Sequence, residues 1–356
     1  MKHSHDALAG TLVIALLVTT GLWYAQDPEC QNWPLSCFST GPTESGISWV
    51  TINRIEWSAD GQRLLSLCHG KVNSEGQLAL HDLEPEGASV PIDAIDDLVA
   101  TAALAPDGRH VLIGSNHGHL WWIDIDSTES STPLVELTDS KHPFFSAVAI
   151  APDGRLIAGS AEAGTVHVCD PRRRSSVKLT AREPGSFRAL RFARDGQRLI
   201  GSQTNGRIVL WNVVTGDVLQ ELAGHPGPTL TAEFPYDNKR IISAGLDDTV
   251  RIWDIATGDE LWRGEFGLCG INALTVSPDG STAAWGGFSR RIIVWDLDRQ
   301  QKKFEIISPA TRIYDLAFSP DGTSLAAGGS EEFIRLYDVQ TGAETKRIEV
   351  ASPESL

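Results

Sequence analysis

Short runs of apolar residues separated by polar turns cover the chain from about residue 50 to its end. Residues 230–266 show the pattern: apolar-rich runs at 230–234, 240–244, 249–255 and 260–266 alternate with turn sequences such as Pro-Tyr-Asp-Asn and Ala-Thr-Gly. Runs of this length, rich in β-branched and aromatic residues, predict antiparallel strands joined by hairpins. Because no helical period occurs in this region, each unit is expected to be a four-stranded meander.

This unit occurs seven times. A turn aspartate marks each copy, and the last five of these aspartates are 42 residues apart. In six copies a second, strand-ending pair that finishes in Asp or Asn comes 17 residues later, and in four of the six its first member is Trp or Tyr. A fixed period of about 40 to 45 residues is typical of propeller blades, which bury their faces against neighbouring blades. The sequence therefore predicts an all-β, seven-bladed β-propeller over residues 47–350, with turn aspartates at Asp60, Asp107, Asp153, Asp195, Asp237, Asp279 and Asp321.

The fifth copy carries the residues by which the repeat resembles a known family. Gly224-His225, Ser243, Asp247 and Trp253-Asp254 occupy the Gly-His, Ser/Thr, turn-Asp and Trp-Asp positions of WD-repeat β-propellers. The resemblance covers about residues 52–350 and implies a hydrogen-bonded tetrad of His225, Ser243, Asp247 and Trp253. We expect it in the fifth blade alone, with packing and backbone pairing in the other six, because the Asp247 position is otherwise Glu75, His117, Ala163, Asn205, Ser289 and Glu331.

Closure of the ring is a separate question. In the family, an N-terminal strand usually completes the last blade. Here residues 345–350 align with the fourth run of the earlier copies. We therefore expect the C-terminal end to supply all four strands of the seventh blade, with residues 47–51 as a lead-in.

The first 50 residues differ from the repeats. After a short tail (1–6), residues 7–25 contain no charge, which is long enough for a helix across a hydrocarbon core. A cleaved signal peptide is the alternative, but Trp23 and Tyr24 suit an interfacial anchor and small residues are poorly placed for cleavage. We expect a transmembrane or signal-anchor helix, a tether (26–46) and, because Lys2 precedes the helix, an extracytoplasmic propeller on a single-pass membrane protein.

Cysteines and glycosylation signals fit that placement. Cys30 and Cys37 lie in the tether, where an oxidising compartment would allow a disulfide. The three other cysteines are expected to fill core or loop positions. No Asn-x-Ser/Thr acceptor occurs, which favours a bacterial chain over a eukaryotic secretory one. A C-terminal tail (351–356) follows the propeller.

Charge limits the choice of partners. The net charge of −16 argues against nucleic acid, because phosphate binding needs a basic surface. Residues 172–207 nevertheless hold ten basic and two acidic side chains. We interpret part of this segment as a bottom basic sector that docks an acidic protein or anionic lipid; a solvated charge run is the alternative. Its expected members are Arg172, Arg173, Arg174, Arg194 and Arg198.

The opposite face, which carries the His225 and Asp247 loops, is the expected partner-binding face. In WD-repeat proteins this top rim often holds peptides, and mixed aromatic and polar groups are typical of an interface centre. Burial between loops is the alternative for its phenylalanines. The candidate rim residues are Asn116, His117, Phe144, Glu162, Phe187, Thr204, Leu246, Phe288 and Glu331.

The sequence contains no motif for catalysis or cofactor binding. His117 and His119 lack a nearby third ligand, so a solvated turn is expected there rather than a metal site. The inner mouth offers only isolated carboxylates and histidines. We therefore expect a non-catalytic platform that binds other proteins and uses no cofactor. A small-molecule sensor or enzyme with a site in the central channel is the alternative, and a structural subunit of an envelope complex is a third possibility.

Overall fold

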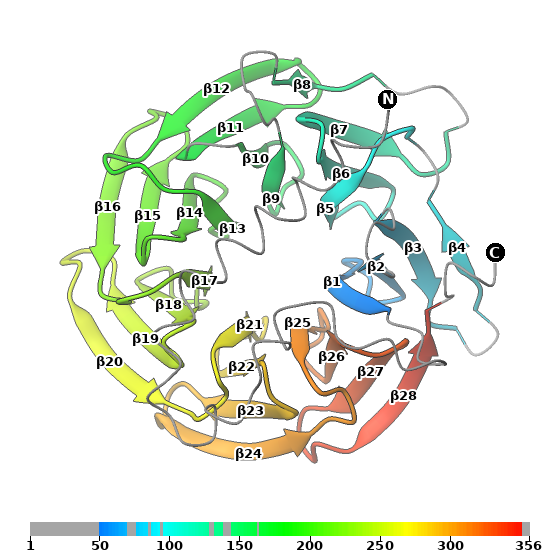
Figure 1. Ribbon diagram of the computed structural model, residues 1–356, viewed down its shortest axis with the longest axis vertical. Coiled ribbons are helices and arrows are strands. Elements are labelled where there is room, and N and C mark those ends of the chain that lie inside the picture. The colour runs from blue at the N-terminus through cyan, green and yellow to red at the C-terminus, as the bar shows by residue number, and fades with distance from the viewer. Residues whose placement is uncertain are drawn as a thin grey trace, which may run out of the picture. The chain divides into compact units, whose positions relative to one another are not determined.

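The computed structural model describes residues 50–69, 76–84, 87–92, 95–127, 132–137, 144–161 and 164–350. They form seven four-stranded antiparallel sheets arranged as blades round a central axis, as Figure 1 shows. The chain runs through the strands of each blade in order, beginning with the innermost. The predicted fold, an all-β propeller of seven four-stranded blades, is confirmed.

The strand bounds follow the apolar runs of the sequence. Blade one consists of β1 (Thr51–Trp57), β2 (Arg63–His69), β3 (Gln77–Asp82) and β4 (Ser89–Pro91), and blade two of β5 (Val99–Leu104), β6 (His110–Ser115), β7 (His119–Asp124) and β8 (Val135–Glu136). Blade three consists of β9 (Phe145–Ile150), β10 (Ile157–Ala161), β11 (Thr165–Asp170) and β12 (Ser175–Thr180), and blade four of β13 (Phe187–Phe192), β14 (Arg198–Gln203), β15 (Arg207–Asn212) and β16 (Val218–Ala223). Blade five consists of β17 (Thr229–Glu233), β18 (Arg240–Gly245), β19 (Thr249–Asp254) and β20 (Glu260–Glu265), and blade six of β21 (Ile271–Val276), β22 (Thr282–Gly287), β23 (Arg291–Asp296) and β24 (Gln301–Ile307). Blade seven consists of β25 (Ile313–Phe318), β26 (Ser324–Gly329), β27 (Phe333–Asp338) and β28 (Glu344–Glu349).

The turn aspartates repeat because each one closes the hairpin between the two inner strands of its blade. In all seven blades the Oδ1 of this Asp accepts the backbone N–H two residues further on, at 2.9–3.0 Å. This Asx turn leads into a left-handed residue, which is a glycine with φ of 66–74° in six blades and Asn238 in blade five. The strand-ending Asp or Asn makes the same bond after the third strand of each blade.

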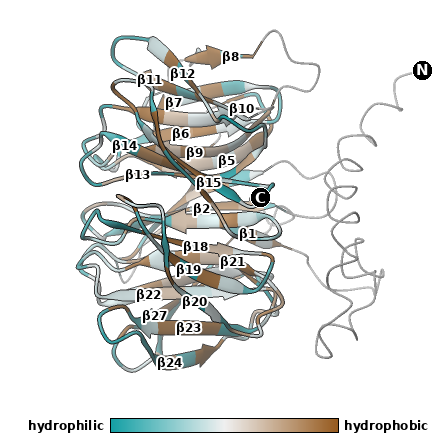
Figure 2. Cartoon of the chain, turned by 90° about the vertical axis from the view of Figure 1, so that its left-hand side faces the viewer, coloured by the Kyte–Doolittle hydropathy of each residue, from teal (hydrophilic) through white to brown (hydrophobic). Residues whose placement is uncertain are grey.

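The core lies between the blades. The buried apolar residues that the structure describes fall into seven clusters, and each cluster joins one pair of neighbouring blades. Figure 2 shows the apolar segments of the strands stacked between hydrophilic loops. Because every blade is covered on both faces, its inner strands are continuous apolar runs, whereas the outer strands alternate between exposed and half-buried residues. The stack of blades is thus held mainly by apolar burial.

Among the described strands, none is shared between the two ends of the ring. Blade seven is built wholly from β25–β28, as the sequence predicted, and β1 is the innermost strand of blade one. Besides the apolar cluster of blades seven and one, two side chains join their inner strands. Asp315 accepts the backbone N–H of Ile55 at 2.8 Å, and the Trp57 indole donates to the carbonyl of Ala317 at 3.1 Å.

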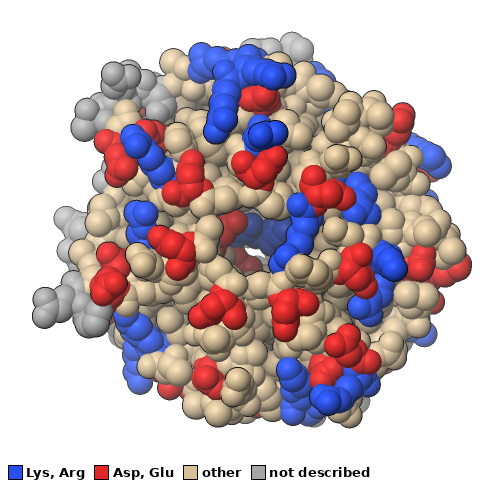
Figure 3. Space-filling model, turned by 180° about the vertical axis from the view of Figure 1, so that it is seen from behind, with Lys and Arg blue, Asp and Glu red and all other residues tan. Residues whose placement is uncertain are grey.

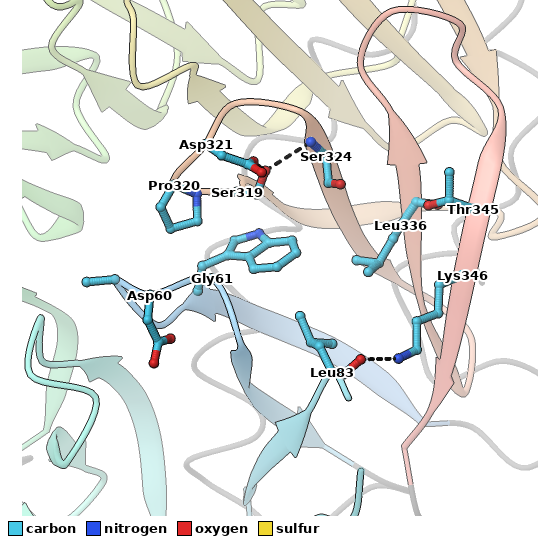
Figure 4. A pocket seen from close by; sticks show the side chains of 12 residues that line it. Asp60, Gly61, Leu83, Ser319, Pro320, Asp321, Ser324, Leu336, Thr345 and Lys346 are labelled. Atoms are coloured by element: carbon cyan, nitrogen blue, oxygen red, sulfur yellow. Dashed lines mark hydrogen bonds between the residues drawn. The ribbon is translucent and has the colours of Figure 1, made fainter. Parts of the chain in front are cut away.

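A pocket of about 550 Å³ lies at this junction, between the turns of blades one and seven. In Figure 4, Lys346 of β28 reaches across it toward Leu83, the residue after β3. The Lys346 Nζ donates to the Leu83 carbonyl at 2.7 Å. This bond ties the outer part of the last blade to the first blade, where no covalent connection exists.

Several predictions concern residues that the structure does not describe. The predicted membrane helix (7–25), the tether (26–46), the lead-in residues 47–49, both tails and the Cys30–Cys37 pair lie outside the described residues. Within the described ranges, no helix is long and apolar enough to cross a membrane. Cys68 and Cys169 are buried and free, as expected of core residues, whereas Cys269 is disulfide-bonded and is not the simple filler we expected.

Candidate functional site

The structure assembles the four residues of the predicted tetrad at one edge of blade five. His225 Nε2 lies 2.7 Å from Ser243 Oγ, His225 Nδ1 lies 2.9 Å from Asp247 Oδ1, and the Trp253 indole donates to Ser243 Oγ at 2.9 Å. The His225 side chain is fully buried, so each polar group needs these partners. Burial opposes ionisation of Asp247, but hydrogen bonds, first that from His225, lower its pKa. The tetrad is therefore a buried structural unit.

Blades one and two replace this unit with other side-chain hydrogen bonds, which corrects our expectation that all six other blades rely on packing and backbone pairing. In blade one, His81 takes the Trp253 position and Ser66 the Ser243 position, with His81 Nε2 2.7 Å from Ser66 Oγ. His81 Nδ1 lies 2.7 Å from Ser89 Oγ. Burial lowers the pKa of His81 to about 4. A neutral imidazole thus replaces the indole as the hydrogen-bonding partner of the serine. It also links β3 to β4.

Blade two carries a charge-reversed version of the His225–Asp247 pair. Asp97, in the loop before β5, lies 2.6 Å from Nδ1 of both His117 and His119, which flank the β6–β7 turn. The Asp97 side chain is only 3% exposed. Burial opposes its ionisation, but hydrogen bonds from His119, Ser115 and His117 outweigh that effect and lower its pKa to about 2.

The turn is solvated as expected at His117, whose side chain is 61% exposed, but both histidines are also held by Asp97, which we did not expect. Gly118, with φ of 80°, folds the chain so that both rings turn to the same carboxylate, whereas an extended chain would direct them apart. The Trp121 indole adds a third donor at 3.3 Å. Among the described residues, no group of three or more His, Cys, Asp or Glu side chains is arranged to hold a metal ion.

In blade seven, the carboxylate of the rim residue Glu331 forms an ion pair within the blade. Arg335 donates from Nε and Nη2 to Glu331, and from Nη1 to Glu344, at 2.7–3.1 Å. The Glu331 side chain is 15% exposed. It therefore contributes structure rather than a free charge on the rim.

The structure also corrects one aromatic candidate. Phe187 has no exposed surface, because it packs edge-on against Trp211 at a centroid distance of 5.2 Å, inside the cluster between blades three and four. It cannot contact a partner directly. Of the remaining candidates, Asn116 and His117 are exposed, Phe144, Thr204, Leu246 and Phe288 are half-buried, and Glu162 lies outside the described residues.

The five predicted bottom arginines have different surroundings. Arg172, Arg173 and Arg174 are exposed at the β11–β12 turn. Arg194 and Arg198 instead reach over blade five: the Arg194 guanidinium lies 4.2 Å from the centroid of the Tyr236 ring, and Arg198 pairs with Asp195 at 2.7 Å and bonds the carbonyl of Asn238 at 2.9 Å. Arg194 also donates to the carbonyl of Pro278 in blade six.

The central channel is where the sequence was least informative. Figure 3 shows basic and acidic side chains crowded round the opening at the axis. Each innermost strand carries a bulge near its start, where its register with the second strand shifts by one residue. A bulge redirects a side chain that regular alternation would place elsewhere. The seven bulge residues are Asn53, Ala100, Ser146, Arg188, Leu230, Asn272 and Tyr314.

Below the bulges, charged side chains cluster along the channel wall. Arg191 Nε lies 2.5 Å from Glu233, linking blades four and five, and Arg54 lies 4.0 Å from both Glu56 and Asp315. Burial raises the pKa values of Glu56 and Glu233, and the arginine charges oppose that rise. The carboxylates here are thus clustered, not isolated as the sequence suggested. One sequence signal could have revealed this cluster: charged residues occur at equivalent positions in the first apolar run of several repeats.

Two comparisons with known proteins bear on this molecule. A family model described as outer membrane protein assembly factor BamB matches residues 202–355, from β14 through the last three blades, which is less than half of the chain. The SVP1-like protein 2 of Emericella nidulans is 29% identical over 132 residues, or 37% of this chain. The aligned region spans 40% of that protein's length. Both similarities are partial, and they support a repeat architecture without placing the chain in a family.

Proposed function

We propose that this protein is a non-catalytic interaction platform of the WD-repeat type, held at a membrane by residues 7–25 with the propeller outside the cytoplasm. The observation that carries the proposal is the contrast between the two ends of the blades. The turns between the inner strands are alike in all seven blades. The turn at the other end holds a different side chain from blade to blade: His117, Asn205, Asp247, Ser289 or Glu331.

A rigid ring with varied side chains on one face is suited to selective contact with another protein. Rigidity lowers the entropy lost on binding, and variation among equivalent positions gives each sector its own chemistry. The sector of blade two is the favoured centre of contact. There the exposed Asn116 and His117 lie beside a buried carboxylate that fixes the imidazole. The name of the matched family model, an assembly factor for outer membrane proteins, agrees with a role in contact with other proteins.

Site-specific photocrosslinking of the full-length protein in membranes tests the proposal. A photoreactive residue at Asn116 should give discrete adducts with one or a few proteins. The matched control is the same residue at Val214, which is 75% exposed in the β15–β16 turn at the opposite end of the blades. Adducts at Val214 alone would move the interface to that face, and a lack of adducts at both positions would contradict the platform function.

The basic sector and the membrane helix need separate tests. Exchange of Arg172, Arg173 and Arg174 for Glu should abolish recovery on anionic vesicles or on an acidic partner, if that turn docks either. Deletion of residues 7–25 should release the protein from membranes washed at alkaline pH. A protein that stays with the membrane after this deletion would show that another segment, or a partner, holds it there.

A further inference from the structure

The bulge residues at the channel mouth include one cation, Arg188, that has no partner among the residues the structure describes. Arg188 is exposed, although it belongs to β13, the innermost strand of blade four. The faces of β13 are covered by blades three and five, and its outer edge pairs with β14. Arg188 can therefore reach solvent only at the central opening. Within the part of the chain that the structure describes, no carboxylate lies in ion-pair or hydrogen-bond contact with its guanidinium.

This distinguishes Arg188 from the other arginines of the channel. Arg191 is neutralised by Glu233, and Arg54 lies close to both Glu56 and Asp315. The surrounding protein displaces water from Arg188 and lowers its pKa. A guanidinium that faces solvent inside a channel and has no counter-charge is available to bind an anion that enters the opening.

Three other bulge residues, in blades one, six and seven on the other side of the channel from Arg188, are neutral hydrogen-bonding groups. Asn53 accepts the Thr51 hydroxyl at its Oδ1, which leaves its amide N–H groups free to donate. Asn272 uses one N–H to bind the carbonyl of Tyr314, and the Tyr314 hydroxyl makes no hydrogen bond to a described residue. Since the bulges fall at equivalent positions of the seven inner strands, these groups lie at one level of the channel. The seven bulge residues include one guanidinium and several hydrogen-bond donors, and none of the seven is a carboxylate.

We propose that these bulge residues form a binding site for a small oxyanion, a carboxylate or phosphate group, with the Arg188 guanidinium as its cationic contact and Asn53 and Tyr314 as donors. Arginine suits this role because its planar fork can donate two parallel hydrogen bonds to either kind of group. The site is independent of the platform function, because it lies on the axis rather than on the outer part of the rim. A ligand there would touch several blades at once.

Isothermal titration of the full-length protein in detergent tests the site, at constant ionic strength, with inorganic phosphate in one arm and succinate in the other. We expect saturable binding of at least one probe at one site per chain. Arg188→Gln should weaken it about tenfold or more. The matched control, Arg182→Gln, removes an exposed arginine from the loop after β12 and should bind as the wild type does.

Tyr314→Phe keeps the test decisive if Arg188→Gln does not fold. It removes one hydroxyl without changing charge, and it should weaken binding by a measurable factor while the circular dichroism spectrum is unchanged. Binding that is lost in Arg188→Gln and kept in Arg182→Gln supports the site. No saturable binding of either probe, or equal affinity in all three variants and the wild type, overturns it.

Discussion

Asp97 is a single carboxylate whose ionised form the fold strongly favours. Its pKa of about 2 lies below the ordinary value for aspartate, mainly because two histidines and Ser115 hydrogen-bond to it. A depressed carboxylate pKa adds stability that is present above about pH 4 and is lost as the pH falls through 2. Asp97→Asn should therefore lower the free energy of unfolding by about 2 kcal/mol at pH 7 and by much less near pH 2. Urea denaturation of both proteins across this range measures the difference, and a pH-independent difference would contradict the explanation.

Folding also favours the deprotonated form of His81, which for an imidazole is the uncharged ring. Burial lowers its pKa to about 4, so folding favours the neutral ring. The unfolded chain takes up a proton as the pH falls through about 6.5, and stability falls from there down to about pH 4. His81→Gln, which cannot titrate, should remove up to about 3 kcal/mol of this acid destabilisation. His69 and His167, whose pKa values burial also lowers, stay in the variant as an internal control. An unchanged pH dependence in the variant would contradict the role given to His81.

Asp247 is expected to contribute strongly to stability, because several buried side chains depend on its carboxylate. It contacts His225, Thr249 and Arg251, all of them buried. Asp247→Ala should cost about 2 to 3 kcal/mol, because it leaves buried donors without an acceptor. Asn205 occupies the same position in blade four but is exposed, and Asn205→Ala should cost less than about 1 kcal/mol. Equal melting temperatures for the two variants would contradict this ranking.

Among the strands, the outermost ones of blades one and two are unusually short. β4 has three residues and β8 two, against six in β16 and in β20. Within the described residues, few backbone hydrogen bonds therefore protect the outer edge of β7, which pairs with β8 at His119 and Leu120. In hydrogen exchange, the amides of β7 should exchange faster than those of the equivalent β19, whose outer edge pairs along its length with β20. Equal protection of β7 and β19 would show that another segment covers this edge.

Strands and turns were predictable from sequence, whereas most of the site was not. Strand bounds follow from apolar runs, and turns follow from Asp and Gly, because both depend on residues close together in the chain. The ion pair of Arg191 with Glu233 joins two repeats 42 residues apart, and Asp97 meets His119 across 22 residues. Phe187 could not be assigned correctly because its exposure depends on the facing Trp211 of the same blade. The local sequence pattern therefore predicts strands and turns, whereas the surroundings of a side chain depend on how the blades pack in the ring.

Across the whole molecule, closure of the ring is the step with the largest entropic cost. Neighbouring blades elsewhere are joined by short loops, but blade seven meets blade one only after nearly 300 residues. Polar bridges between inner strands occur on both kinds of interface. Asp315 binds Ile55 across the closing interface, and Asn272 binds the carbonyl of Tyr314 across the covalently connected interface of blades six and seven.

These two bridges allow a test of closure. Asp315→Ala should cost about 2 to 3 kcal/mol, because it removes a charged acceptor from a buried N–H and leaves Arg54 with one carboxylate fewer. Asn272→Ala should cost about 1 kcal/mol, because only a neutral hydrogen bond at a connected interface is lost. We also expect Asp315→Ala to increase hydrogen exchange first in β1 and β25, the strands that face each other at the closing interface. Exchange that increases equally in every blade would mean that the ring unfolds as one unit and that its closing interface is no weaker than the other six.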